Sequence, residues 1–146
     1  MPARFIGMLF ISFCHIVMAE GLEFGQGWSR QMVPGAPSAV IYGQFENKGD
    51  KDLSVQRITS EVAGMAMIHR SVIENGMMKM RHVDELRIPP GESIVLKPGG
   101  LHIMLSELKK DLVEKDTFDI RIHTSDGESY TASIVVGSIG QMSSPD

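Results

Sequence analysis

The sequence predicts an all-β protein, folded as a sandwich or a barrel. Apolar residues recur mostly with a period of two, and no long segment has the 3.6-residue period of an amphipathic helix. Short apolar segments alternate with clusters of Gly, Pro, Asn and Asp, which are typical turn residues. Short strands at this spacing are characteristic of β-sandwiches and β-barrels.

Nine strands are expected, each ending where the alternating pattern meets turn-forming residues. In chain order they are residues 22–29, 39–46, 52–60, 66–74, 77–83, 93–97, 101–107, 117–124 and 129–136. The pattern of residues 106–116 does not distinguish a turn of helix from a loop.

The Asn75-Gly76 pair is the strongest turn signal, because both residues tolerate the positive φ that a two-residue hairpin turn requires. It predicts an antiparallel pair between residues 66–74 and 77–83. His69 and Met80 are therefore expected on neighbouring strands, at similar distances from the turn.

Residues 1–19 have the features of a cleaved secretory signal: a positive charge at Arg4, a short apolar run, and Ala19 as the last residue before cleavage. The apolar run, about 14 residues long, is too short to cross a bilayer comfortably. The only cysteine, Cys14, lies within it, after a Phe13 that is too bulky for a bacterial lipoprotein signal. We expect one domain at residues 20–137 and a flexible polar tail at residues 138–146.

Composition excludes several classes of function. With 18 acidic and 14 basic residues and a formal net charge of −4, the chain has no basic surface for nucleic acid. No later segment is apolar enough for stable membrane insertion. No nucleophile motif and no phosphate-binding loop is present, so the sequence does not indicate an enzyme. A mature chain without cysteine suits the oxidising periplasm.

Two histidines and two methionines form a candidate metal site. His102 and Met104 are two residues apart, so on a strand they project from the same face about 6.6 Å apart. His69 and Met80 are brought near each other by the predicted hairpin. Imidazole and thioether are soft donors that favour Cu(I), whereas Zn(II) prefers thiolate, imidazole or carboxylate and Ca(II) and Mg(II) prefer oxygen.

Other residues of the same types have simpler interpretations. Methionine is a common filler of cores and a single histidine on a strand is usually solvated. The expected apolar rim of the site consists of Met65, Met67, Met77 and Met78, of which Met67 and Met78 could substitute as ligands. His82 and His123 are interpreted as surface histidines, because His82 has no paired donor at matching spacing and His123 alternates with buried positions.

The complete spacing, His69-x10-Met80-x21-His102-x-Met104, resembles the signature of the periplasmic copper chaperone family PCu(A)C. The surrounding segments 75–81, 88–92 and 96–105 are similar to that family as well. The resemblance implies a cupredoxin-like Greek-key β-sandwich that holds Cu(I) through these four residues.

The resemblance also implies that the protein delivers Cu(I) in the periplasm to the copper-site subunit of a respiratory haem-copper oxidase, directly or with a Sco-type thioredoxin-like partner. Two alternatives remain open. One is a periplasmic copper scavenger that confers tolerance without delivery, and the other is a metal-free secreted β-sandwich scaffold.

The sequence departs from the family pattern at two places. Arg70 occupies the position after the first histidine, where the family usually has an acidic residue. The C-terminal residues 140–146 contain no histidine, so the additional Cu(II) site found in some members is not predicted.

Overall fold

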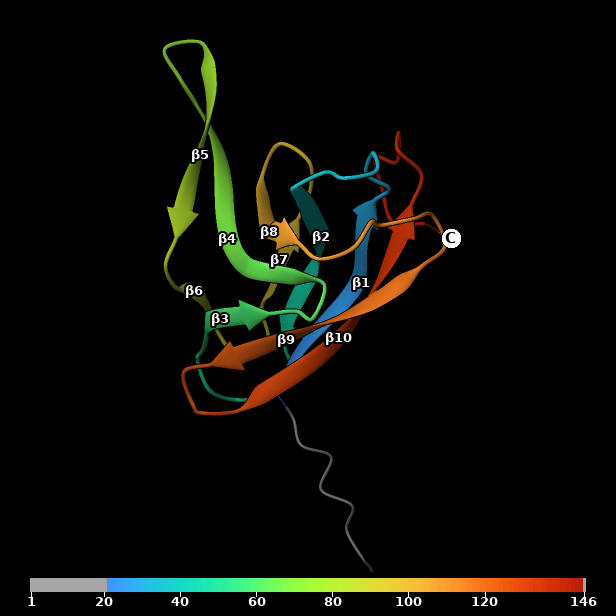
Figure 1. Cartoon of the computed structure of the whole chain (residues 1–146). Coiled ribbons are helices and arrows are strands. Elements are labelled where there is room, and N and C mark those ends of the chain that lie inside the picture. The colour runs from blue at the N-terminus through green and yellow to red at the C-terminus, as the bar shows by residue number, and fades with distance from the viewer. Residues whose placement is uncertain (1–20, 146) are drawn as a thin grey trace, which may run out of the picture.

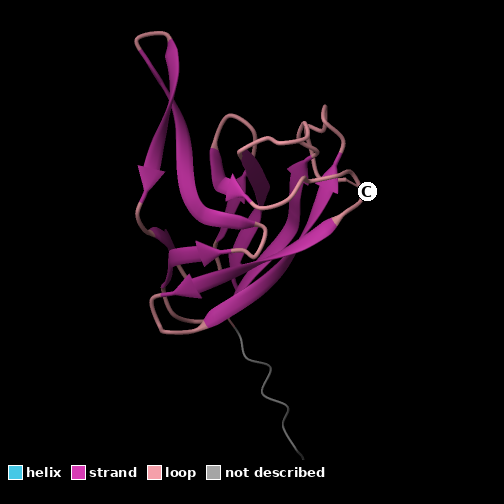
Figure 2. Ribbon diagram, in the orientation of Figure 1, coloured by secondary structure: helices cyan, strands magenta, loops and turns pink. Residues whose placement is uncertain are grey.

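The computed structural model describes residues 21–145, and within them it contains strands and no helix (Figures 1 and 2). The strands are β1 (Leu22–Arg30), β2 (Ser38–Asn47), β3 (Leu53–Thr59), β4 (Ala63–Glu74), β5 (Met77–Val83), β6 (Leu86–Ile88), β7 (Ser93–Leu96), β8 (Leu101–Leu108), β9 (Thr117–Thr124) and β10 (Ser129–Gly137). The predicted all-β class is confirmed.

The strands form one sheet in the order β5-β4-β8-β2-β1-β10-β9-β3-β6, with β7 added to β2. A single pairing between Ile58 of β3 and Ala66 of β4 joins two distant members of this path. The sheet therefore closes on itself from β4 to β3, and its inner faces pack against each other as in a sandwich. Neighbouring strands are antiparallel except β1 and β10, where Trp28 lies opposite Val135.

The core lies between the facing walls of the closed sheet and is filled by the apolar side chains that alternate along the strands. On β8, for example, Leu101, Ile103 and Leu105 are buried in the core. On the opposite side of the strand, His102 and Met104 project from the outer face of the wall. The same alternation that fills the core therefore presents the candidate ligands outside it.

The β4–β5 hairpin extends well beyond the rest of the molecule (Figure 1). Its turn residues have positive φ, 51° at Asn75 and 75° at Gly76, and Glu74 pairs with Met77 across the turn. The Asn-Gly hairpin predicted from the sequence is therefore confirmed.

One strand was not expected from the sequence. The segment β6 has only three residues, of which Arg87 is exposed, and Pro89 follows it directly. Three residues are too few to establish a period of two. The strand forms because Leu86 and Ile88 pair with Val55 and Leu53 of β3 and are buried against the core.

The ambiguous segment 106–116 is the end of β8 followed by a loop, with no helical turn. Leu112 anchors the loop: its side chain is only 1% exposed, and its carbonyl accepts a hydrogen bond from the backbone N–H of Met32 at 3.3 Å. One buried apolar residue thus holds this segment against the core without a helix.

The expected signal at residues 1–19 lies outside the described residues. At the other end of the chain, the Arg30 guanidinium donates a hydrogen bond to the carbonyl of Gln141 and contacts the sulfur of Met142 at 3.3 Å. Within residues 21–145, no segment forms a helix of the length and apolar character needed to cross a membrane.

A buried asparagine ties β2 to β6. The Asn47 side chain is fully buried; its Nδ2 donates to the carbonyls of Lys51 and Ile88 at 2.6 and 2.9 Å, and its Oδ1 accepts from the N–H of Gly49 at 3.0 Å. Such a side chain replaces backbone pairing where the chain leaves a strand.

Replacing Asn47 with alanine is expected to lower the free energy of unfolding by about 3 kcal/mol, since three hydrogen bonds of about 1 kcal/mol each are lost and the buried carbonyl of Ile88 loses a donor. Urea denaturation measures this loss. The control is Asp50→Ala in the same loop, an exposed position where a change within about 0.5 kcal/mol is expected. Equal stability of the two variants would contradict the prediction.

Candidate metal centre

The centre of the site is a pair of histidines on adjacent strands. The antiparallel pairing of β4 with β8 places His69 directly opposite His102. Directly opposed residues project from the same face, and the two ring centroids are 5.9 Å apart with the planes at 83°. The two predicted histidine ligands are therefore brought together.

The turn between β7 and β8 fixes the orientation of His102. The carbonyl of Gly100 accepts a hydrogen bond from the N–H of Ser71 at 3.1 Å and lies 3.1 Å from Nδ1 of His102. A carbonyl only accepts, so Nδ1 carries the hydrogen of the neutral ring and Nε2 keeps a free lone pair. The tautomer of His102 is thus assigned from its hydrogen-bond partner, the Gly100 carbonyl.

Two ring nitrogens are buried without a hydrogen-bond partner: Nε2 of His102 and Nδ1 of His69. His102 is only 3% exposed. Buried polar atoms in proteins normally have a hydrogen-bond partner, so an unpartnered ring nitrogen is a candidate ligand atom. Together with the Gly100 contact, the free lone pair of His102 is what a metal ligand requires.

The protonation of His69 is biased toward the neutral ring. Burial lowers the pKa of His69 below its ordinary value of 6.5, and the neighbouring His102 and His82 rings lower it further. A neutral imidazole is the form that binds a metal ion. The site therefore favours the ligating form of His69 before any ion arrives.

The two predicted methionine ligands lie on the same face as the histidines. Met104 is two residues from His102 and pairs with Met67 of β4. Met80 of β5 lies opposite Ser71, two residues along β4 from His69. His69 and Met80 are thus on neighbouring strands, as predicted, in a diagonal relation. Met80 is 52% exposed, so the outer side of the site is open to solvent.

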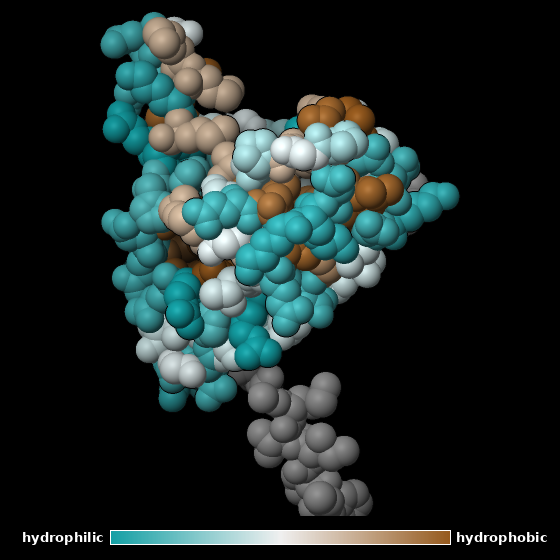
Figure 3. Space-filling model, in the orientation of Figure 1, coloured by the Kyte–Doolittle hydropathy of each residue, from teal (hydrophilic) through white to brown (hydrophobic). Residues whose placement is uncertain are grey.

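The expected rim of methionines is divided between two faces. Met65 and Met67 alternate with His69 along β4, and Met78 alternates with Met80 along β5, so these three share the face of the candidate ligands. Met77 pairs with Glu74 and projects from the other face. Figure 3 shows that hydrophobic residues reach the exposed hairpin, where Met78 is 63% exposed.

His82 is the residue of this region that the sequence interpretation missed. It is a half-exposed surface residue, as expected, but it does have a paired donor: it lies directly opposite His69, with ring centroids 5.7 Å apart. Its spacing of two from Met80 was the available signal, since it places both side chains on one face of β5. His102, His69 and His82 therefore form one row across three strands.

Arg70 does not face the candidate ligands, although it follows His69 in the sequence. It pairs with Arg81 of β5 and Leu101 of β8 on the opposite face of the sheet. On that face Glu74 forms ion pairs with Arg81 and with Lys79, the latter at 3.6 Å. Strand alternation thus separates the charged residues of the hairpin from its histidines and from all of its methionines except Met77.

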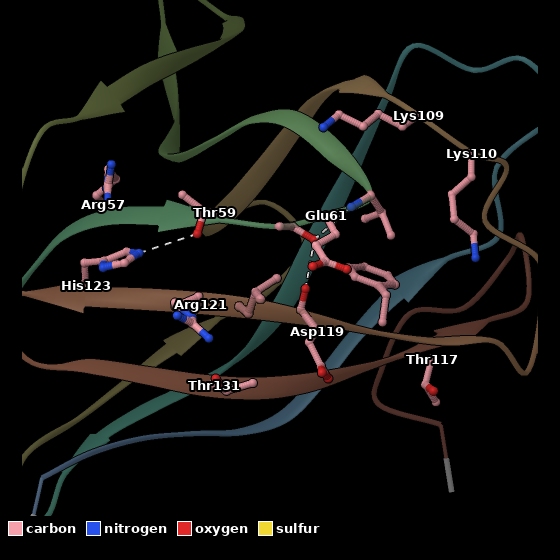
Figure 4. A pocket seen from close by; sticks show the side chains of 14 residues that line it. Arg57, Thr59, Glu61, Lys109, Lys110, Thr117, Asp119, Arg121, His123 and Thr131 are labelled. Carbon is pink, nitrogen blue, oxygen red and sulfur yellow. Dashed lines mark hydrogen bonds between the residues drawn. The ribbon is translucent and has the colours of Figure 1, made fainter.

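His123 lies away from this region, on the outer face of β9, as predicted. It lines a broad depression together with Arg57, Arg121 and other polar residues (Figure 4), and its Nε2 is 3.5 Å from Oγ1 of Thr59. Burial, Arg57 and Arg121 lower the pKa of His123. No methionine lines this depression, so it lacks the soft donors of the β4–β8 face.

The chemistry of the β4–β8 face depends on its methionines. Across residues 21–145, no three His, Cys, Asp or Glu side chains are grouped closely enough to hold a metal ion by themselves. The available donors are a close pair of imidazoles and the flanking thioethers. This set is suited to a soft, monovalent ion rather than to Zn(II) or Ca(II).

Comparison with known proteins identifies relatives of the whole domain. Residues 22–136 match the family model "Putative lipoprotein LpqE-like". The chain is 30% identical over 119 residues to "Putative lipoprotein Lxx21020" of Leifsonia xyli subsp. xyli, covering 81% of this chain and 70% of that protein. It is also 30% identical over 119 residues to protein RP573 of Rickettsia prowazekii, covering 79% of this chain and 66% of that protein.

Solved structures share the fold. The copper-bound PCuAC domain from PmoF2 has a TM-score of 0.67 at 17% identity, covering 80% of this chain and 92% of that domain. The apo PCuAC domain from PmoF1 has a TM-score of 0.66 at 21% identity, with 80% and 93% covered. The Cu(I) form of DR1885 from Deinococcus radiodurans has a TM-score of 0.62 at 24% identity, with 76% and 74% covered. These structural matches confirm the fold that the PCu(A)C resemblance implied. The family match over residues 22–136 shows that the chain belongs to the LpqE-like family.

Proposed function

We propose that this protein is a copper chaperone that binds one Cu(I) ion through His69, Met80, His102 and Met104. The observation that carries the proposal is the buried, unpartnered Nε2 of His102 next to the His69 ring, with thioethers on the same face. Two neutral imidazoles and two thioethers satisfy a d¹⁰ ion without adding negative charge.

The donor set favours transport over redox function. A blue-copper electron-transfer centre uses a cysteine thiolate, and the only cysteine of this sequence is Cys14, in the expected signal. Without thiolate, binding remains exchangeable. The half-exposed Met80 on β5 gives a partner access to one ligand, while the buried His102 holds the inner side. A carrier needs both properties.

The proposed destination is the copper-site subunit of a respiratory haem-copper oxidase, reached directly or through a Sco-type partner, and the proposed location is the periplasm. Two observations support a role in copper handling: the PmoF2 domain is copper-bound and DR1885 is solved with Cu(I). The lipoprotein description of the family supports a location in the cell envelope. The proposal includes no catalytic step.

The site itself is tested by an anaerobic titration of the protein with Cu(I) against a chromophoric chelator. The parent is expected to bind one equivalent, and the variant His102→Gln with Met104→Leu is expected to lose at least about 100-fold in affinity, since two of four donors are removed.

The matched control is His123→Gln with Met142→Leu, which removes one histidine and one methionine outside the β4–β8 face. It is expected to bind as the parent does. Circular dichroism of both variants establishes that they are folded. Equal affinity of all three proteins would exclude His102 and Met104 as ligands and overturn the proposed site.

Copper affinity is also expected to depend on pH. Protons compete with the ion for His69, and its lowered pKa means that this competition begins below the ordinary value of 6.5. The same titration should therefore give a nearly constant affinity between pH 8 and 7 and a falling affinity from about pH 6.5 to 5. A constant affinity down to pH 5 would exclude the histidines as ligands.

Deletion of the gene distinguishes delivery from scavenging. A chaperone for the oxidase predicts low oxidase activity at limiting copper that recovers when copper is added to the medium. A scavenger predicts normal oxidase activity and increased sensitivity to excess copper. A metal-free scaffold predicts neither phenotype. Oxidase activity and growth in graded copper, measured in the same strains, therefore separate the three functions.

A further inference from the structure

Three histidines, not two, lie in one row across the outer face of the sheet. His69 of β4 is opposite His102 of β8 on one side and opposite His82 of β5 on the other. The ring centroids are 5.9 and 5.7 Å apart, and both contacts are nearly perpendicular, at 83° and 87°. The His-x10-Met-x21-His-x-Met signature includes His69 and His102 but not His82.

The two outer rings of the row have partners that fix their hydrogens. Nδ1 of His102 faces the Gly100 carbonyl, and Nε2 of His82 lies 3.0 Å from Oδ1 of Asp84. In the neutral ring Nε2 of His82 donates to this carboxylate, so its Nδ1 has the free lone pair. A carboxylate on the far nitrogen is the common arrangement behind a metal-bound imidazole, because it orients the ring and raises its basicity.

We propose that His82 is a third imidazole ligand of the same centre and that this ligand allows the centre to hold Cu(II) as well as Cu(I). The inference rests on the proposed function for the roles of His69 and His102. Thioethers support Cu(I), whereas Cu(II) is a harder ion that favours nitrogen donors. A third imidazole therefore changes the preference of the centre in the direction of Cu(II).

Binding requires His82 to move. Among residues 21–145, no three His, Cys, Asp or Glu side chains are grouped closely enough to hold an ion. His82 is able to move because its side chain is 47% exposed and it lies on β5, the terminal strand of the sheet. His102 is buried and fixed by Gly100, so it forms the permanent part of the site. His82 then closes over an ion held by the other two rings.

The test compares both oxidation states in the purified protein and in His82→Gln. With one equivalent of Cu(II), pulsed electron paramagnetic resonance of the parent is expected to count three imidazoles, and the variant two. Competition with glycine is expected to show at least about a tenfold loss of Cu(II) affinity in the variant. The anaerobic Cu(I) affinity is expected to change less than about threefold, since its four donors are retained.

Two further variants make the result specific. His123→Gln removes a histidine outside the row, on β9, and is expected to leave both affinities unchanged. Asp84→Asn removes the carboxylate that contacts His82 but keeps the His82 ring. This variant is expected to bind Cu(II) more weakly, while the resonance experiment still counts three imidazoles bound to the ion.

Two results would overturn the proposal without affecting the chaperone function: two imidazoles in the parent, or a Cu(II) affinity that His82→Gln does not change. Either would mean that His82 and Asp84 form only a surface ion pair. If the parent protein does not bind Cu(I), the proposed function and the role of His82 are both wrong.

Discussion

The antiparallel register between β4 and β8 is the constraint on which both the fold and the candidate site depend. It joins segments that are distant in the sequence, and with the Ile58–Ala66 pairing it closes the sheet. It also sets His69 opposite His102. Because side chains alternate, a slip of β4 by one residue against β8 would move Ile68 out of the core and His69 into it. The hydrophobic core and the histidine pair therefore specify the same register.

The long β4–β5 hairpin separates two kinds of chemistry by the same alternation. One face carries His69, Met80 and His82, and the other carries Arg70, Arg81 and the ion pairs of Glu74. Beyond the body of the molecule the hairpin buries little, and its terminal strand β5 is exposed along most of its length. Charged residues such as Lys79 and Arg81 on an edge strand discourage pairing with other chains.

The exposure of the hairpin is consistent with a site that exchanges its cargo. Ile73, Met77 and Met78, close to the turn of the hairpin, are each more than 60% exposed. At the other end of the row, His102 is buried and oriented by a backbone carbonyl. The site thus has a rigid inner part and an adaptable outer part, and methionine is well suited to the second because its side chain is flexible and polarisable.

The sequence by itself determined the all-β class, most strand positions, the Asn75-Gly76 hairpin and the four candidate ligands, because these depend on local periodicity, turn chemistry and spacing. It did not identify β6, whose three residues become a strand only by pairing with β3, and it placed the start of β4 at Ala66 although pairing with β8 extends that strand to Ala63. It also left His82 without a partner. Which residues oppose one another across strands is set by tertiary register, so only the folded structure decided that His82, His69 and His102 form one row.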